Sequence, residues 1–247
     1  MTNLPGGVSV SRLRVYDWPA PDGVGRAGSG TPHLHLASTE AYVVLSGTGA
    51  VHTLSTDGFA EHPLRRGVVV TIQPGVIHRA VNDGDLEVLV VMSNAGLPES
   101  GDAIMTFPPA SLVDLATYRE AATLPSGVGA HAEATDEQVA HAARARRDLA
   151  LQGYAQLREV AERTSPRAAL QPFFEAAVRL VRPSVPRWQD LWGRTAFAET
   201  DATAAVLEGL MRGAAPHLQV GRAERIESAP APRRYGMCGR LETWAVA

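Results

Sequence analysis

Hydrophobic and polar residues alternate over short stretches in the first part of the chain and recur at helical spacing in the second. Stretches such as "VSVSRLRV", "AYVVLSG", "GVVVTI" and "EVLVVM" are rich in β-branched residues, and glycine, proline and aspartate separate them. Many short strands between frequent turns are typical of a β-sandwich or barrel. The pattern therefore predicts a mainly β fold over residues 1–108.

After residue 110 the apolar positions follow a helical period, most clearly in "DEQVAHAARARRDLALQGYAQLREVAER". Prolines in "PSVPRW" should break this pattern. We expect a helical region over residues 109–215, acting as a lid or a dimerisation surface, and an extended tail over 216–247 that packs back on the barrel. The expected helix starts are Ser111, Thr135 with Gln138 as a capping box, Ser165 before Pro166, and Asp201.

Two histidines lie one residue apart in the strand-like run "HLHLA". Side chains at positions i and i+2 of a strand point to the same face, so His33 and His35 can share one metal ion. Glu40 follows five positions later, which is the wrong parity for one continuous strand. The small polar residues between them allow a turn or bulge that would bring Glu40 back to the same side.

A third histidine follows the turn signal Pro74-Gly75 in "GVVVTIQPGVIHRAVN". His78 begins the next predicted strand there. Three imidazoles and one carboxylate form a four-ligand set, and an octahedral ion held in this way keeps two positions open for water, substrate or dioxygen. We call His33, His35, Glu40 and His78 the ligand cluster.

These residues resemble the two signature motifs of the cupin superfamily. The first motif is matched by His33, His35, Glu40 and Gly47. The leading glycine of this motif corresponds to Gly28, which lies one position later than the motif requires. The second motif is matched by Gly67, Gly75, His78 and Asn82. The proline of this motif corresponds to Pro74, which lies one position later than the motif requires. The resemblance covers roughly residues 8 to 108 and is closest to small, single-barrel, type-2-like cupins. It implies a double-stranded β-helix, or jelly-roll barrel, with a helical extension.

The resemblance implies one divalent transition metal, with Fe, Mn, Ni, Co and Zn all compatible with the donor set. It also implies a small-molecule substrate and a homodimer, because cupin barrels often pair. Cupins with this ligand set carry out several reactions, so the fold does not fix the activity. Oxidation of a small oxygen-bearing molecule by dioxygen is the first hypothesis. The alternatives are a sugar-like isomerase or epimerase and a non-catalytic binding or regulatory cupin.

Other side chains are candidates for the same cavity. Tyr42 shares the parity of Glu40 and is either a proton donor or a barrel-filling aromatic. His52 is a candidate general base, and Glu40 is either a metal ligand or a base. Met92 is expected to form an apolar wall, whereas parity sends Arg79 outward, to a surface or interface position. The basic residues Arg144, Arg146 and Arg147 are expected on a solvated helix face.

Composition excludes some chemistry. All 23 basic residues are arginine, so neither a Schiff-base lysine nor a phosphate-binding GK[ST] loop is present. The net charge of -3 argues against a nucleic-acid partner. Cys238 is the single cysteine and is expected to be a buried, unpaired thiol. With no signal-peptide pattern and no membrane-length apolar run, we expect a cytoplasmic protein.

Overall fold

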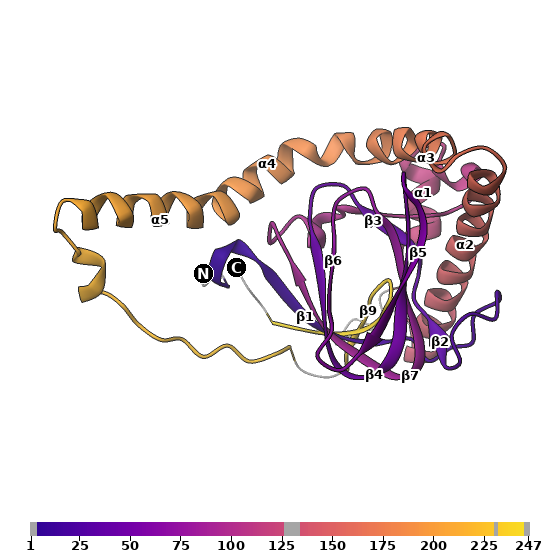
Figure 1. Ribbon diagram of the computed structural model, residues 1–247, viewed down its shortest axis with the longest axis horizontal. Helices are drawn as coiled ribbons and strands as arrows, with labels where there is room; N and C mark the ends of the chain where they lie inside the picture. Colours follow the sequence, from indigo (N-terminus) through magenta and orange to yellow (C-terminus); the bar gives the residue numbers. More distant parts are fainter. Residues whose placement is uncertain (1–3, 126–133, 230–231, 245–247) are drawn as a thin grey trace.

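The computed structural model describes residues 4–125, 134–229 and 232–244. Its centre is a ten-stranded antiparallel sheet that curves into a barrel, with helices along one side (Figure 1). The predicted fold class, a jelly-roll barrel followed by an α-helical region, is confirmed. The predicted boundaries between the barrel, the helical region and the tail, at residues 108 and 215, stay predictions. The strands are β1 (Ser9–Val15), β2 (Gly28–Ser29), β3 (His33–His35), β4 (Glu40–Ser55), β5 (Gly58–Arg65), β6 (Val69–Ile72), β7 (Ile77–Met92), β8 (Ala103–Met105), β9 (Arg234–Tyr235) and β10 (Gly239–Thr243).

Two long strands, β4 and β7, form the backbone of the barrel. They pair antiparallel from Glu40 opposite Met92 to Leu54 opposite Ile77, with register irregularities between Val44 and Gly49. The strand order is β5-β4-β7-β1-β10-β9, and β3 pairs with both β7 and β8. Because β10 lies beside β1, the C-terminal part of the chain covers an edge that β1 would otherwise expose.

The helices follow the barrel in the chain. The capping box at Thr135 and the cap at Ser165 are confirmed. The other two expected caps are wrong: Ser111 lies in a short 3-10 turn before Asp114, which caps the first helix, and Asp201 lies inside the last helix. The helices are α1 (Leu115–Ala122), α2 (Asp136–Arg163), α3 (Pro166–Val181), α4 (Val185–Arg194) and α5 (Ala196–Met211).

Two apolar cores hold the described residues together. The first fills the barrel and includes Leu13, Val51 and Val88. The second joins the outer face of the barrel to the helices, with Ile77 and Phe173 among its buried members. Burial of large apolar side chains on both faces of the sheet fixes the helices against the barrel.

Helix α2 approaches the barrel closely at Gly153. A Cβ atom on this glycine would lie 2.0 Å from the carbonyl oxygen of Thr106, so no larger side chain fits. The hydroxyl of Thr106 donates to the carbonyl oxygen of Ala150 at 2.9 Å. These contacts join the segment after β8 directly to α2.

Two expectations about arginine side chains are wrong. Arg147 and Arg146 do not lie on a solvated face. Arg147 is 0% exposed and donates to the carbonyl oxygens of Trp18 and Pro19, and Arg146 donates to that of Gly236. The carbonyl groups of irregular segments need donors when buried, and these guanidinium groups supply them.

Arg79 does point out of the barrel, as parity requires, but it is not on the surface. Its guanidinium donates to Asp22 at 2.7 Å and lies 5.4 Å from the centre of the Tyr154 ring. The side chain is only 1% exposed because α2 covers this face of the sheet. Of the two positions expected for Arg79, it therefore takes the interface and not the surface.

The end of the helical region extends away from the barrel. Helix α5 projects outward as a continuation of α4, and the chain then returns along an extended path (Figure 1). No residue of α5 is buried, although Phe197, Leu207, Leu210 and Met211 are large and apolar. Within the described ranges, no helix is both long and apolar enough to cross a bilayer.

Candidate metal centre

The ligand cluster comes from three strands of the barrel. His33 and His35 lie on β3, and His33 pairs directly with His78 on β7. The chain bends after His35 and begins the new strand β4 at Glu40. This bend removes the parity mismatch between Glu40 and the two histidines, as expected from the sequence.

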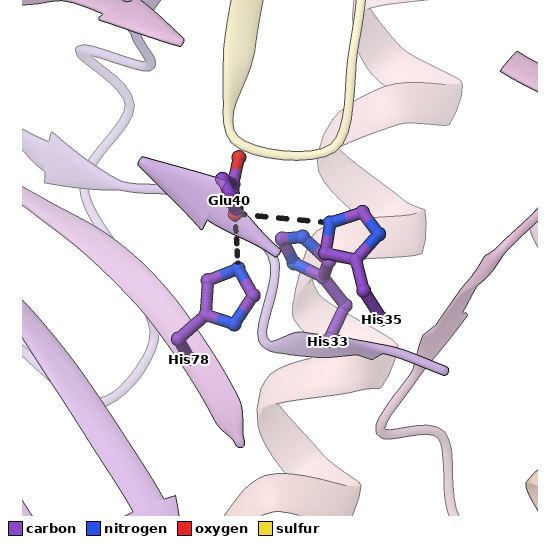
Figure 2. A group of neighbouring side chains, drawn as sticks. All are labelled: His33, His35, Glu40 and His78. Carbon is purple, nitrogen blue, oxygen red and sulfur yellow. Dashed lines mark ion pairs between the residues drawn. The ribbon is translucent and has the colours of Figure 1, made fainter. Parts of the chain in front are cut away.

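The four side chains point toward one another in the barrel interior (Figure 2). Each offers one ligand atom, and these atoms all lie within 4.8 Å of one another. An Oε2 atom of Glu40 lies 2.7 Å from Nε2 of His78 and 3.7 Å from Nε2 of His35. All four residues are buried, with exposed fractions of 5% or less. This spacing fits donors that share one cation at bond lengths of about 2.0 to 2.2 Å.

Backbone carbonyl groups fix the tautomer of two histidines. The Nδ1 atom of His33 lies 2.8 Å from the carbonyl oxygen of Thr31, and that of His78 lies 3.0 Å from the carbonyl oxygen of Val76. A carbonyl oxygen only accepts, so each Nδ1 carries the proton and each Nε2 keeps its lone pair. This is the usual arrangement of a histidine that binds a metal through Nε2.

The charges in the cluster match the protonation states that a metal requires. Burial alone would raise the pKa of Glu40, but the charge of His78 and its hydrogen bond, then His35 and His33, lower that pKa to about 2. Burial, with His78 and His35 close by, holds the pKa of His33 well below its usual value. A neutral imidazole and an ionised carboxylate are the forms that bind a divalent cation.

Asp102 organises the loop between His35 and Glu40, and the sequence analysis missed it. Its carboxylate is completely buried and accepts hydrogen bonds from the backbone N–H groups of Leu36, Ala37 and Ser38, at 3.0, 2.8 and 2.9 Å. Its Oδ2 also lies 3.7 Å from Nδ1 of His35. One carboxylate thus fixes the loop that joins two members of the ligand cluster.

Asp102 and His35 each shift the pKa of the other. Burial opposes the charge on His35, but the nearby carboxylates of Asp102 and Glu40 raise its pKa. Burial likewise opposes the charge on Asp102, and the proximity of His35 and the hydrogen bonds from the Ser38 and Ala37 backbone lower its pKa. A carboxylate behind a metal-binding histidine orients the ring and makes it a better ligand.

Tyr42 and Cys238 lie beside the cluster. Tyr42 is 1% exposed, lines the same cavity as Glu40 and donates toward Sγ of Cys238 at 3.9 Å. Burial, then the charges of Cys238 and Glu40, hold the pKa of Tyr42 well above its usual value. Burial, assisted by Glu40, raises the pKa of Cys238 to about 12. Both groups therefore stay protonated near neutral pH.

Cys238 reaches the site through the C-terminal hairpin. The loop between β9 and β10 passes over the cluster, drawn in pale yellow in Figure 2. Sγ of Cys238 lies 3.9 Å from Nδ1 of His33 and 3.7 Å from the carbonyl oxygen of Thr31. Cys238 is buried and unpaired, as expected, but no pattern in the sequence predicts its position beside the histidines.

His52 does not join the cluster. Its Nε2 lies 2.9 Å from Glu61, its ring packs on Phe59, and it is not among the residues that line the cavity. The register of β4 shifts between Val44 and Gly49, so the inward parity changes along the strand. Val51 consequently faces the barrel core, and His52 faces outward. The expectation that His52 acts as a base in this cavity is therefore wrong.

Three members of the ligand cluster line a cavity of about 480 Å³. His33, His35, Glu40 and Tyr42 line it together with Met92, which forms an apolar wall as expected. This volume is within the range of small-molecule sites in proteins, about 300 to 1,000 Å³. The site therefore combines a four-donor cluster with room for a small organic ligand.

The barrel and the cluster define the class of the protein. The family model for the cupin domain matches residues 24–93, which include all four members of the ligand cluster. The barrel is therefore a cupin domain. Cupins resemble one another in fold while differing in reaction, so this assignment does not by itself supply an activity.

Two curated relatives are plant proteins. Germin-like protein 3-5 of Oryza sativa subsp. japonica is 30% identical over 102 residues, covering 36% of this chain and 45% of the relative. Oxalate oxidase 1 of Hordeum vulgare is 29% identical over 105 residues, covering 37% of this chain and 52% of the relative. The chain spans about half the length of the curated relatives it matches.

Solved structures align with this chain at low similarity. The capsular polysaccharide assembling protein CapF from Staphylococcus aureus is 22% identical, with a TM-score of 0.31, over 42% of this chain and 29% of that chain. The nucleoside dehydratase Pac13 is 18% identical, with a TM-score of 0.30, over 41% of this chain and 70% of that chain. Such overlaps say nothing about the reaction of this protein.

The first prediction concerns metal content. Protein purified without chelators should carry one divalent ion per chain, measured by plasma mass spectrometry. The His33→Ala/His35→Ala variant should carry none, because two of four donors are lost. A control variant, His62→Ala/His141→Ala, removes two histidines outside the cluster and should keep the metal. Stoichiometric metal in the His33→Ala/His35→Ala variant would contradict the assignment.

The second prediction concerns Asp102. The Asp102→Asn variant loses the charge behind His35 and one of the two acceptor oxygens that hold the loop. Metal affinity, measured by competition with a chelator, should fall about 10- to 100-fold. The Asp57→Asn variant, at an exposed turn, serves as the control. An Asp102→Asn affinity within about twofold of the wild type would show that the loop is held in place by other contacts.

Proposed function

We propose that the protein is a metal-dependent enzyme that oxidises a small oxygen-bearing molecule with dioxygen. The observation that carries the proposal is the convergence of four buried donor atoms beside a cavity large enough for a substrate. A redox-active divalent ion with two free coordination positions would bind a substrate oxygen and dioxygen next to each other. The name of the relative oxalate oxidase 1 supports an oxidative reaction by analogy only.

The proposed roles of the protein residues follow from their contacts. His33, His35 and His78 would supply three nitrogen donors, and Glu40 would supply an anionic oxygen that offsets part of the cation charge. Tyr42 remains protonated and is placed to donate a hydrogen bond to a bound substrate oxygen. The buried walls exclude bulk water from the reacting atoms.

Isomerisation or epimerisation is the second candidate. One observation favours it: an ionised Glu40 and a protonated Tyr42 lie on the same face of β4, so a base and an acid are available together. In that reaction the cation would polarise a carbonyl group and need no dioxygen. A regulatory cupin, the third class, would bind a ligand without converting it.

The third prediction separates these classes. Protein loaded with Fe²⁺ should consume dioxygen in an electrode chamber when given a matching substrate from a panel of small organic acids and diketones. Consumption should disappear in the His33→Ala/His35→Ala variant. Conversion of a substrate without dioxygen uptake would instead support the isomerase. Ligand-induced thermal stabilisation without any conversion would support a binding protein.

We also propose that the protein is a homodimer in the cytoplasm and that α5 contributes to the interface. A helix with no buried residue and several large apolar side chains is rarely stable in water by itself. Association of two copies would bury these side chains. The proposed compartment rests on the single unpaired thiol of Cys238, which favours reducing conditions.

The fourth prediction tests the dimer. Light scattering should give the mass of two chains for the wild type and of one chain for a Leu207→Ser/Leu210→Ser variant. The control, Val69→Ser/Val178→Ser, removes two equally exposed apolar side chains elsewhere and should leave the dimer intact. A monomeric wild type would exclude the dimer. A dimeric Leu207→Ser/Leu210→Ser variant would place the interface away from α5.

A further inference from the structure

Buried and exposed polar side chains line the same cavity. We call its buried part, with His33, His35, Glu40 and Tyr42, the floor, and its exposed part, with the arginines Arg187 and Arg234, the opening. The rest of the lining, called the middle, is mainly apolar and includes Leu13, Val90, Met92, Leu191, Met237 and Leu241. The hydroxyl groups of Ser9, Ser11, Ser100 and Thr243 also line the cavity.

The two arginines reach the opening from distant parts of the chain. Arg187 lies on α4 and Arg234 lies on β9. In the described part of the chain neither guanidinium group has an ion-pair or hydrogen-bond partner, so both are available to a ligand. The only acidic side chain at the opening is Glu99, whose Oε2 already accepts from the backbone N–H of Gly96 at 2.8 Å.

The opening and the middle of the cavity therefore select different parts of a ligand. A guanidinium group presents a planar fork of donors that matches a carboxylate or a phosphate. The mainly apolar lining offers few partners for the many hydroxyl groups of a sugar, which would lose water there. An alkyl or aromatic body gains free energy in the same place.

We infer that the cavity takes an amphipathic organic acid. Its acid group binds Arg187 or Arg234 at the opening, its apolar body lies against the apolar side chains, and a second oxygen group reaches the floor. An amphipathic acid would be the substrate class of the proposed enzyme. Only the contact of its second oxygen group with the floor rests on the proposed function. This substrate class also favours oxidation over isomerisation of a sugar-like compound.

The fifth prediction uses two series of simple acids as probes. Zn²⁺-loaded protein, which cannot turn over dioxygen, is titrated by calorimetry with linear dicarboxylates from adipate to sebacate. Monocarboxylates of the same carbon number, from hexanoate to decanoate, form the second series. At the best chain length the dicarboxylate should bind about tenfold or more tightly than its monocarboxylate, because both the floor and the opening are then used.

A matched pair of variants assigns the effect to the opening. In Arg187→Gln/Arg234→Gln the advantage of the dicarboxylate should fall below about twofold. The control variant Arg182→Gln/Arg194→Gln removes the same charge from exposed positions that do not line the cavity. It should keep the advantage of the dicarboxylate. The inference is overturned if no dicarboxylate exceeds its monocarboxylate. It is also overturned if the advantage survives in the first variant or disappears equally in the control.

Measurements on metal-free protein distinguish a failure of this inference from a failure of the proposed function. Metal content is measured on the same samples, so failure to bind Zn²⁺ is detected directly. Without metal, a monocarboxylate should still bind through the opening and should lose that binding in Arg187→Gln/Arg234→Gln. Binding of the monocarboxylate that is unchanged by this variant would refute the role of the arginines whatever the metal result.

Discussion

The register between β3 and β7 is the constraint on which the site depends. It places His33 directly opposite His78 and therefore brings two donors from distant parts of the sequence into one layer of the barrel. His35 joins them because side chains alternate along β3. A shift of one residue in this pairing would turn the histidines to the other face and leave Glu40 without partners. The long pairing of β4 with β7 holds that register in place.

The loop between β3 and β4 completes the arrangement. Three consecutive backbone N–H groups converge on the carboxylate of Asp102, so the bend that returns the chain toward Glu40 has a fixed shape. Burying three imidazoles and a carboxylate together is costly unless they are paired or bound to a cation. Two Nδ1 atoms already bind backbone carbonyl groups, so a cation is the partner that best satisfies the remaining lone pairs.

Much of the site could be predicted because it depends on local spacing. The interval between His33 and His35 and the turn before His78 are both visible in the sequence, and they identify the barrel and all four donors. Asp102 could not be found in this way, because its role depends on a contact across 64 to 66 residues. Cys238 reaches the cluster from the other end of the chain. In both cases tertiary packing, not local pattern, decides the position.

The errors have specific physical causes. His52 was assigned to the cavity by assuming uniform alternation along β4, but the register irregularities after Val44 change which residues face inward. Strand parity sent Arg79 outward to a surface or interface, and Arg147 was expected on a solvated helix face because it belongs to a basic cluster. Both are buried where α2 packs on the barrel, because Asp22 and the carbonyl groups near Trp18 need charged donors there. Sequence patterns predict which face a side chain takes, but they do not show what will cover that face.

The central claim is that the ligand cluster holds one cation, and anomalous diffraction from crystals of protein purified without chelators tests it most directly. Data collected on both sides of the absorption edge of the metal found in the sample should give one strong peak per chain. That peak should lie about 2.0 to 2.2 Å from donor atoms of His33, His35, Glu40 and His78. Well-ordered side chains around an empty centre, or a peak bound by other residues, would contradict the account.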